Sequence, residues 1–160
     1  MRRPVVSTDV LVSYECAGKS IPQIIRSKGG GIVAWRFFRQ KELEVLRKIS
    51  TLKNVVVDCG GGIIVDLDAK GVERYSANKV RLLRKNAVVV WLKADPGVLA
   101  EKNAADPRRP ALGRTNEKDI MVRHKPFYSK AAHVSVPADD LGAKDLSRRI
   151  LKRISSFLPP

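Results

Sequence analysis

Apolar residues recur along the chain at two different spacings, which predict a mixture of helices and strands. Over residues 35–49, an apolar stripe recurs every three to five residues, close to the helical period, at Phe38, Leu43, Leu46 and Ile49. Over 54–67 and 87–96, apolar residues follow one another with little interruption, which is typical of buried strands. Strands that alternate with helices predict an α/β fold, a three-layer α/β/α arrangement with a parallel sheet covered on both faces.

Weaker patterns predict the elements between these segments. A short strand at 5–6 leads into a helix from about 9 to 17, and Ser20 caps a second helix that ends near 27. The glycine-rich segment 29–34 is predicted to break the helical pattern, and the polar segment 68–78 to form turns. Further helices are expected at 77–85, 97–105, 117–129 and 143–157, with a strand at 132–136. The length fits a single domain over residues 1–160.

Composition narrows the kinds of partner and compartment. Apolar residues make up 44% of the chain, enough for a core, and no apolar run approaches the roughly 20 residues of a membrane-spanning helix. The first residues lack the apolar stretch of a secretory signal, and the two cysteines lack metal-ligand spacing. We therefore expect a cytoplasmic protein, or one of the plastid stroma in a plant or alga. The formal net charge of +15 predicts an anionic ligand or partner without identifying it.

The tripeptide Gly18-Lys19-Ser20 has the sequence that ends a phosphate-binding P-loop. A P-loop reads Gly-x-x-x-x-Gly-Lys-Ser/Thr between a strand and a helix, so its first glycine would fall at position 13. That position is Ser13, and the residues before Gly18 have the pattern of a helix. We therefore interpret the tripeptide as a connector between two helices, with Gly18 ending the first.

Asp9 and a series of short segments resemble the shikimate kinase family when they are taken in order and with their distances. Asp9 follows "VVST", and the later segments read "AGKSIPQI", "FRQKELEVL", "VVVDCGGG", "VVVWLKADPGVLAEK", "RRPAL" and "RHKPFY". The resemblance covers nearly the whole chain. It implies a P-loop kinase fold and transfer of the γ-phosphoryl group of ATP to the 3-hydroxyl of shikimate, with Mg²⁺, in chorismate biosynthesis. The family's P-loop precedes the connector, so we expect this chain to lack the first (central) strand, the P-loop and the first helix.

The resemblance implies roles for residues on the first two matching segments. Asp9 corresponds to an aspartate that holds the substrate hydroxyls and assists deprotonation of the nucleophile, whereas from the residues alone it is equally a helix N-cap. Arg39 corresponds to an arginine that binds the substrate carboxylate, oriented by Glu42 one turn on; from the residues alone Arg39 is a solvated helix residue. Residues 30–34 read as an insertion relative to the family, which would misplace Arg39.

Three consecutive glycines follow the apolar run that starts at 54. Gly60, Gly61 and Gly62 correspond to the family's triple-glycine turn, whose backbone amides approach the substrate. Asp58 precedes them where the family has a small residue, and by analogy with a Walker B aspartate it is a candidate to reach a metal ion. Ser7 stands where the family has an acidic residue that helps to bind Mg²⁺, so we assign no metal ligand.

The resemblance implies that two basic side chains bind the nucleotide. Arg109 corresponds to the arginine of the lid loop, predicted over 106–118, which closes over the phosphates and assists catalysis. Lys102 stands where the family has an arginine that stacks on adenine, and a lysine stacks less well. The alternative for both is a basic surface loop. ATP and Mg²⁺ are thus cofactors implied by the family, although most of their binding elements are not found in this sequence.

A second substrate arginine precedes Pro-x-Tyr by two residues in the family, and this chain departs from that pattern. His124 occupies the matching place before Pro126, and Arg123 lies one residue earlier. A shift of one residue rotates a helical side chain by about 100°, so the two side chains cannot both face the site. Arg123 and His124 both remain candidates.

Three functions are therefore considered. The first is a shikimate kinase whose activity is impaired by the absence of the P-loop, and the second is a non-catalytic remnant that still binds shikimate. The third, a nucleic-acid-binding protein, rests on charge alone, and 6% aromatic residues are too few for base stacking. We expect neither nucleic acid nor a membrane as a partner. Because loss of a central strand leaves unpaired strand edges, we expect oligomers or aggregation.

Overall fold

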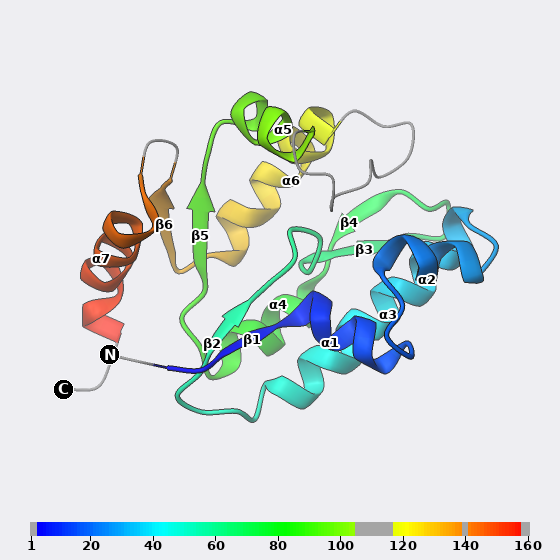
Figure 1. Ribbon diagram of the computed structural model, residues 1–160, viewed down its shortest axis with the longest axis horizontal. Coiled ribbons are helices and arrows are strands. Elements are labelled where there is room, and N and C mark those ends of the chain that lie inside the picture. The colour runs from blue at the N-terminus through cyan, green and yellow to red at the C-terminus, as the bar shows by residue number, and fades with distance from the viewer. Residues whose placement is uncertain (1–2, 105–116, 139–140, 158–160) are drawn as a thin grey trace. The chain divides into compact units, whose positions relative to one another are not determined.

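The computed structural model describes residues 3–104, 117–138 and 141–157 (Figure 1). The chain forms two compact units, Met1–Ala87 and Val88–Pro160. Helices and strands occur in nearly the order that the apolar pattern predicts, and in the described ranges no helix has both the length and the apolar character needed to cross a membrane. The expected single domain over 1–160 stays a prediction.

The first unit combines a parallel strand pair with helices and a hairpin (Figure 1). Strand β1 (Val5–Ser7) runs parallel to β2 (Val56–Asp58), with Val5 opposite Val56 and Ser7 opposite Asp58. Its helices are α1 (Thr8–Glu15), α2 (Ile21–Ser27), α3 (Gly31–Ile49) and α4 (Ala77–Lys85). The hairpin pairs β3 (Val65–Leu67) with β4 (Glu73–Tyr75) in antiparallel orientation.

Helix α3 supplies most of the core of this unit. Its buried positions recur three or four residues apart, which places them on one face. That face packs against α1, α2, α4 and β3, where Val12 of α1 and Ile24 of α2 are also buried. The buried residues of α3 are Ala34, Phe38, Glu42, Val45, Leu46 and Ile49. Glu42 is the one charged residue of the described α3 face, so its carboxylate needs partners inside the protein.

Helix α3 begins at Gly31, so the prediction that residues 29–34 break the helical pattern is wrong for residues 31–34. Gly30 and Gly31 have φ angles of 71° and 61°, which favour glycine at this tight entry. The extra turn is held by the β3–β4 hairpin. Arg36 donates from Nη2 to the carbonyls of residues 68 and 69 at 2.6 Å each, and Ile32 lies against Gly71.

The β3–β4 hairpin corrects the prediction that residues 68–78 form only turns. Asp68 organises its tip: Oδ1 accepts the backbone N–H groups of Lys70 and Val72 at 3.0 and 2.9 Å, and Oδ2 accepts Nε–H of Arg74 at 3.0 Å. The backbone hydrogen bond from Val72, together with that from Lys70 and the Arg74 guanidinium, lowers the pKa of Asp68. An aspartate that binds its own turn thus closes a hairpin of three-residue strands.

The connector Gly18-Lys19-Ser20 joins α1 to α2, as the sequence predicts. Gly18 has a φ of 73°, and its N–H donates to the carbonyl of Ser13 at 2.9 Å, which ends α1. Ser20 starts α2, where its backbone N–H donates to Oε1 of Gln23 at 2.8 Å. A P-loop joins a strand to a helix, so the P-loop interpretation of this tripeptide is wrong.

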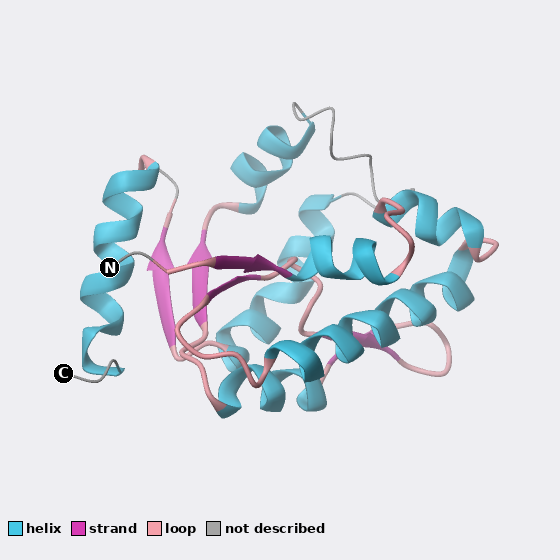
Figure 2. Ribbon diagram, turned by 60° about the horizontal axis from the view of Figure 1, so that its bottom comes forward, coloured by secondary structure: helices cyan, strands magenta, loops and turns pink. Residues whose placement is uncertain are grey.

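The second unit repeats the combination of a parallel strand pair and helices (Figure 2). Strand β5 (Val90–Lys93) runs parallel to β6 (Val134–Pro137), and α7 packs against β6. Helix α5 packs against α6, in which Pro126 replaces one backbone donor. The helices are α5 (Pro96–Ala104), α6 (Glu117–Ala131) and α7 (Ala143–Ile154), and α7 continues into a 3-10 turn, Ser155–Phe157.

The strands are less buried than their apolar sequences predict. Among the described residues, every strand pairs with one neighbour only, in the parallel sheets β1–β2 and β5–β6 and in the antiparallel hairpin. Val5 is 68% exposed, Val56 51% and Leu92 46%. The prediction of fully buried strands is therefore wrong at these positions, because one edge of each strand has no partner in the described ranges.

Candidate substrate-binding site

The glycine turn after β2 lies against Asp9 on one side and Arg39 on the other. A Cβ atom at Gly60 would sit 2.5 Å from Oδ1 of Asp9, and one at Gly62 would sit 2.3 Å from Nη1 of Arg39. Real Cβ contacts are longer, so the two walls close on the turn only because it carries no side chains. The structure thus brings together Asp9, Arg39 and the turn that also includes Gly61.

Helix α1 fixes both Asp9 and the start of this turn. Ser7 occupies the N-cap position, so Asp9 is the second helical residue and its interpretation as the N-cap is wrong. Thr8, which is completely buried, accepts the backbone N–H of Gly60 on Oγ1 at 3.2 Å. The carboxylate of Asp9 therefore lies in the first turn of a helix, beside backbone that is hydrogen-bonded to the same helix.

Arg39 is held by its Nη1 end, which leaves its other edge available. Nη1 donates to both carboxylate oxygens of Glu42 at 2.9 and 3.0 Å and to the carbonyl of Gly62 at 3.0 Å. Nε is buried and has no hydrogen-bond partner among the described residues. The Nε–H group and one Nη2–H group point in the same direction within the guanidinium plane, and this pair of parallel donors matches the two oxygens of a carboxylate.

Two predictions about Arg39 are corrected by this geometry. The side chain is 11% exposed, so it is not a solvated helix residue. Residues 30–34 also do not carry it away from the glycine turn, because they extend α3 by a turn upstream and leave Arg39 in contact with Gly62. The expected contact between Arg39 and Glu42 is confirmed as an ion pair of 2.9 Å.

A buried lysine that the sequence pattern did not single out completes this cluster. Lys79 of α4 is 0% exposed, and its Nζ donates to Oε2 of Glu42 and to the carbonyl of Val65 at 2.9 Å each. The same ammonium group forms an ion pair with Oδ1 of Asp66 at 3.0 Å. The hydroxyl of Ser76 in turn donates to the other oxygen of Asp66. One available signal was the position of Lys79, three and four residues before the apolar Leu82 and Leu83 and hence on one helical face with them.

Burial and neighbouring charges shift two pKa values in this region. Burial raises the pKa of Glu42, while Arg39 and Lys79 act in the opposite direction. The pKa of the Cys59 thiol rises to about 12, because protein atoms crowd its sulfur and because the carboxylates of Asp58 and Asp9 oppose a further negative charge. Although part of Cys59 is open to solvent, it stays protonated at neutral pH.

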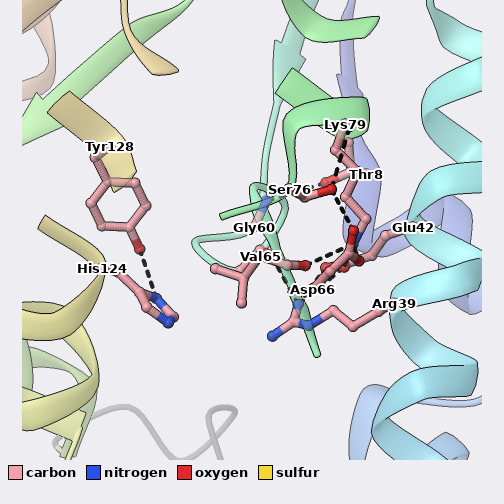
Figure 3. Close-up of polar contacts among 11 residues, drawn as sticks. Thr8, Arg39, Glu42, Gly60, Val65, Asp66, Ser76, Lys79, His124 and Tyr128 are labelled. Carbon is pink, nitrogen blue, oxygen red and sulfur yellow. Dashed lines mark hydrogen bonds and ion pairs between the residues drawn. The ribbon is translucent and has the colours of Figure 1, made fainter. Parts of the chain in front are cut away.

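The two candidates on α6 differ in the direction they face within the second unit. His124 is 3% exposed, and its ring stacks on Phe127 with 6.0 Å between ring centroids. The ring also meets the edge of Tyr128, whose hydroxyl lies 3.5 Å from Nδ1 (Figure 3). Arg123 is exposed. The one-residue shift therefore places the histidine on the buried face of the helix and the arginine on its solvent face.

The nucleotide-side residues lie outside the described part of the chain. Arg109, the side chain of Lys102 and the lid loop up to residue 116 are among the residues not described. Over the described ranges, no group of three or more His, Cys, Asp or Glu side chains is placed to hold a metal ion. Asp58 stands opposite Ser7 in the β1–β2 register, and a carboxylate beside a hydroxyl does not by itself make a cation site.

The amino-acid sequence matches one family over almost its full length. The shikimate kinase family model matches residues 1–155. A shikimate kinase of Leptospira borgpetersenii serovar Hardjo-bovis (strain JB197) is 40% identical over 152 residues, which cover 94% of this chain and 83% of that protein. A shikimate kinase of Leptospira biflexa serovar Patoc is 36% identical over 149 residues, which cover 92% of this chain and 80% of that protein.

Solved structures show the same relationship in three dimensions. The shikimate kinase of Acinetobacter baumannii, solved in complex with shikimate, is 25% identical and superposes with a TM-score of 0.77 over 99% of this chain and 82% of that one. The shikimate kinase of Aquifex aeolicus is 24% identical, with a TM-score of 0.72 over 97% and 83% of the two chains. The predicted α/β fold is thus confirmed as that of this kinase type, and the chain belongs to the shikimate kinase family.

Proposed function

We propose that the described part of this chain binds shikimate between Asp9, Arg39 and the glycine turn, as the acceptor site of an ATP-dependent shikimate kinase. The observation that carries the proposal is the outer edge of Arg39. A buried Nε–H without a partner among the described residues is costly, and a carboxylate of the substrate would satisfy it together with Nη2.

The chemistry expected of this site follows from its two walls. Arg39 would fix the carboxylate of shikimate, so that the ring extends along the glycine turn, which carries no side chain of its own. Asp9 would accept a hydrogen bond from the attacking hydroxyl and take its proton. Binding the acceptor at both ends orients one hydroxyl for transfer, which supplies the positioning that phosphoryl transfer requires.

The remaining roles belong to the same proposal. His124 is proposed as the second group for the substrate carboxylate when its ring is protonated, in preference to the exposed Arg123. Arg109 and Lys102 are proposed for the phosphates and the adenine of ATP. As in the family, ATP would supply the transferred phosphoryl group, and magnesium ions would neutralise the charge of the phosphates.

We further propose that the 160 residues on their own transfer phosphate slowly. The sequence Gly-x-x-x-x-Gly-Lys-Ser/Thr, whose backbone amides cradle the phosphates of a nucleotide, does not occur in them. Shikimate binding without turnover is the second candidate function, favoured because the acceptor-side residues are assembled in the first unit.

Calorimetry of the 160-residue chain with shikimate and then with ATP–Mg²⁺ tests both statements. We expect saturable shikimate binding, weak ATP binding and little ADP release in a coupled assay. Quinate, which is also a polyhydroxylated ring carboxylate, serves as the competitor that reports selectivity. Absence of shikimate binding would contradict the proposed function, whereas turnover at the rate of an intact kinase would contradict the proposed slow transfer.

A further inference from the structure

We infer that Lys79 is a positioning residue for substrate binding, because it fixes Glu42 and through Glu42 the guanidinium of Arg39. The inference rests on the proposed function for its effect on shikimate. The physical linkage itself runs through three side chains of the first unit, on α4 and α3 (Figure 3).

The contacts of Lys79 leave its ammonium group no freedom. Its Nζ donates to Glu42 and to the backbone carbonyl of Val65 at 2.9 Å each, and it forms an ion pair with Asp66 at 3.0 Å. The Lys79 side chain is 0% exposed and that of Glu42 is 2% exposed, so water does not substitute for either partner. Buried, fully satisfied charge networks hold a single geometry, because each alternative leaves a charge without its partner.

Glu42 passes this constraint on to Arg39. Among the described residues, Oε1 accepts only from Arg39, whereas Oε2 accepts from both Arg39 and Lys79. The shared oxygen sets the direction of the carboxylate plane, and the carboxylate in turn holds Nη1 against the carbonyl of Gly62. With Nη1 fixed at both points, the Nε and Nη2 edge can face only one way, which is the orientation that the substrate carboxylate requires.

Loss of Lys79 would weaken the hold of Glu42 on the Arg39 guanidinium. Glu42 would keep one cation instead of two while remaining buried, and burial favours its neutral, protonated form. A neutral Glu42 accepts from Arg39 more weakly, so the guanidinium would sample other orientations. A purely structural lysine would act differently: its loss would lower the stability of the chain without changing the affinity of the folded fraction for a carboxylate.

The test compares Lys79→Met with Lys85→Met, the same change at an exposed position of the same helix. Calorimetry would use shikimate and its analogue in which hydroxymethyl replaces the carboxyl group. We expect Lys79→Met to weaken shikimate binding about tenfold and to leave analogue binding within about twofold of the unmodified chain. In an Arg39→Met background, Lys79→Met should cause no further loss, because its effect passes through Arg39.

A second readout needs no ligand. The ¹H–¹⁵N signal of the Arg39 Nε–H group should shift or broaden in Lys79→Met and stay unchanged in Lys85→Met. If Lys79→Met does not fold, Asp66→Asn replaces it, since that change removes one acceptor of Lys79 and should shift the same signal to a smaller extent.

The outcomes separate the inference from the proposed function. An unmodified chain that fails to bind shikimate, with an Nε signal that responds to Lys79, contradicts the function and supports the linkage. A chain that binds shikimate equally well with and without Lys79, and whose Nε signal does not respond, overturns the inference and leaves the function intact. Equal weakening of shikimate and analogue binding would also overturn it, because the effect would then not pass through the carboxylate.

Discussion

At the scale of single residues, the candidate site depends both on glycines that carry no side chain and on the hydrogen bonds of Arg39. Gly60 and Gly62 leave room that the side chains of Asp9 and Arg39 occupy. Nη1 of Arg39 is hydrogen-bonded to Glu42 and Gly62, whereas its buried Nε has no hydrogen-bond partner among the described residues. Both features can be tested by single substitutions with matched controls.

Replacing Arg39 by Met should weaken shikimate binding about 10- to 100-fold, because hydrogen bonds between charged partners contribute roughly 1.5–3 kcal/mol. Calorimetry on the folded fraction measures the effect. Arg47→Met is the control, since Arg47 lies exposed on the same helix. Equal affinity in both variants would show that the carboxylate binds elsewhere.

Replacing Gly62 by Ala should displace Arg39, because the new Cβ would lie 2.3 Å from Nη1. We expect a loss of about 1–3 kcal/mol in the free energy of unfolding, together with weaker shikimate binding. Urea unfolding and calorimetry report the two effects. Gly142→Ala is the control, because Gly142 has open space around it and should tolerate the change. A Gly62→Ala chain that binds as well as the control would contradict the close packing of the turn.

At the scale of elements, the β3–β4 hairpin and the first turn of α3 depend on each other. Arg36 reaches the hairpin tip from α3, and Asp68 closes the tip from within. Asp66, which forms an ion pair with Lys79, lies on strand β3 of this hairpin. Its integrity is therefore expected to affect the network behind Arg39.

Asp68 should make this hairpin sensitive to acid. Its pKa is lowered in the folded chain, so its stabilising contribution is complete above the ordinary value of 3.8 and is lost as the pH falls through the lowered pKa. Asp68→Asn should unfold at lower urea concentration at pH 7, and its difference from the unmodified chain should shrink at pH 3. Circular dichroism follows the transition, with Asp145→Asn as an exposed control on α7. A difference that grows toward low pH would contradict the assigned direction.

The sequence predicted secondary-structure elements well where the apolar periodicity is strong. It predicted them poorly where an element is stabilised by residues that are distant in the sequence. The stripe through Phe38 and Leu46 identified α3, and the apolar runs identified the main strands. The hairpin was missed because β4 is three residues long and carries Glu73 and Arg74. The start of α3 was missed because its glycines suggest a break, whereas a contact with residues more than thirty positions away extends the helix.

The residues of the candidate site likewise divide into those that the sequence predicted and those that depend on the fold. The resemblance to a family located Asp9, Arg39 and the glycines, and the structure brings them together. It could not rank Arg123 and His124, because that choice depends on which face of α6 is buried. Lys79 was missed because the salt bridge to Glu42 spans 37 positions, a separation that no periodic pattern records.

At the scale of the whole molecule, exposed apolar strand edges and high positive charge act against each other. Val5, Val56 and Leu92 are 68%, 51% and 46% exposed, on strands whose second edge has no partner in the described ranges. These features favour association between chains. The net charge of +15 opposes it by repulsion.

The 160-residue chain should therefore associate more strongly as salt is added. At about 0.1 M salt the Debye length is roughly 10 Å, so repulsion between chains weakens while edge pairing and apolar contact persist. Light scattering over a range of salt concentrations measures the apparent mass. Val5→Lys should reduce association more than Val72→Lys, which changes an exposed valine outside the strands. A chain that stays monomeric at all salt concentrations, with one sharp and reversible unfolding transition, would refute this.

The side-chain-free turn at 60–62 also restricts how this site can change in evolution. Its floor is backbone, and any side chain added at Gly60 or Gly62 would begin with a Cβ atom that collides with Asp9 or Arg39. New ligand preferences must therefore arise at Asp9 and Arg39, or behind Arg39 at Glu42 and Lys79. We therefore expect changes in ligand specificity to arise from substitutions around the glycine turn, and substitutions within the turn to weaken binding.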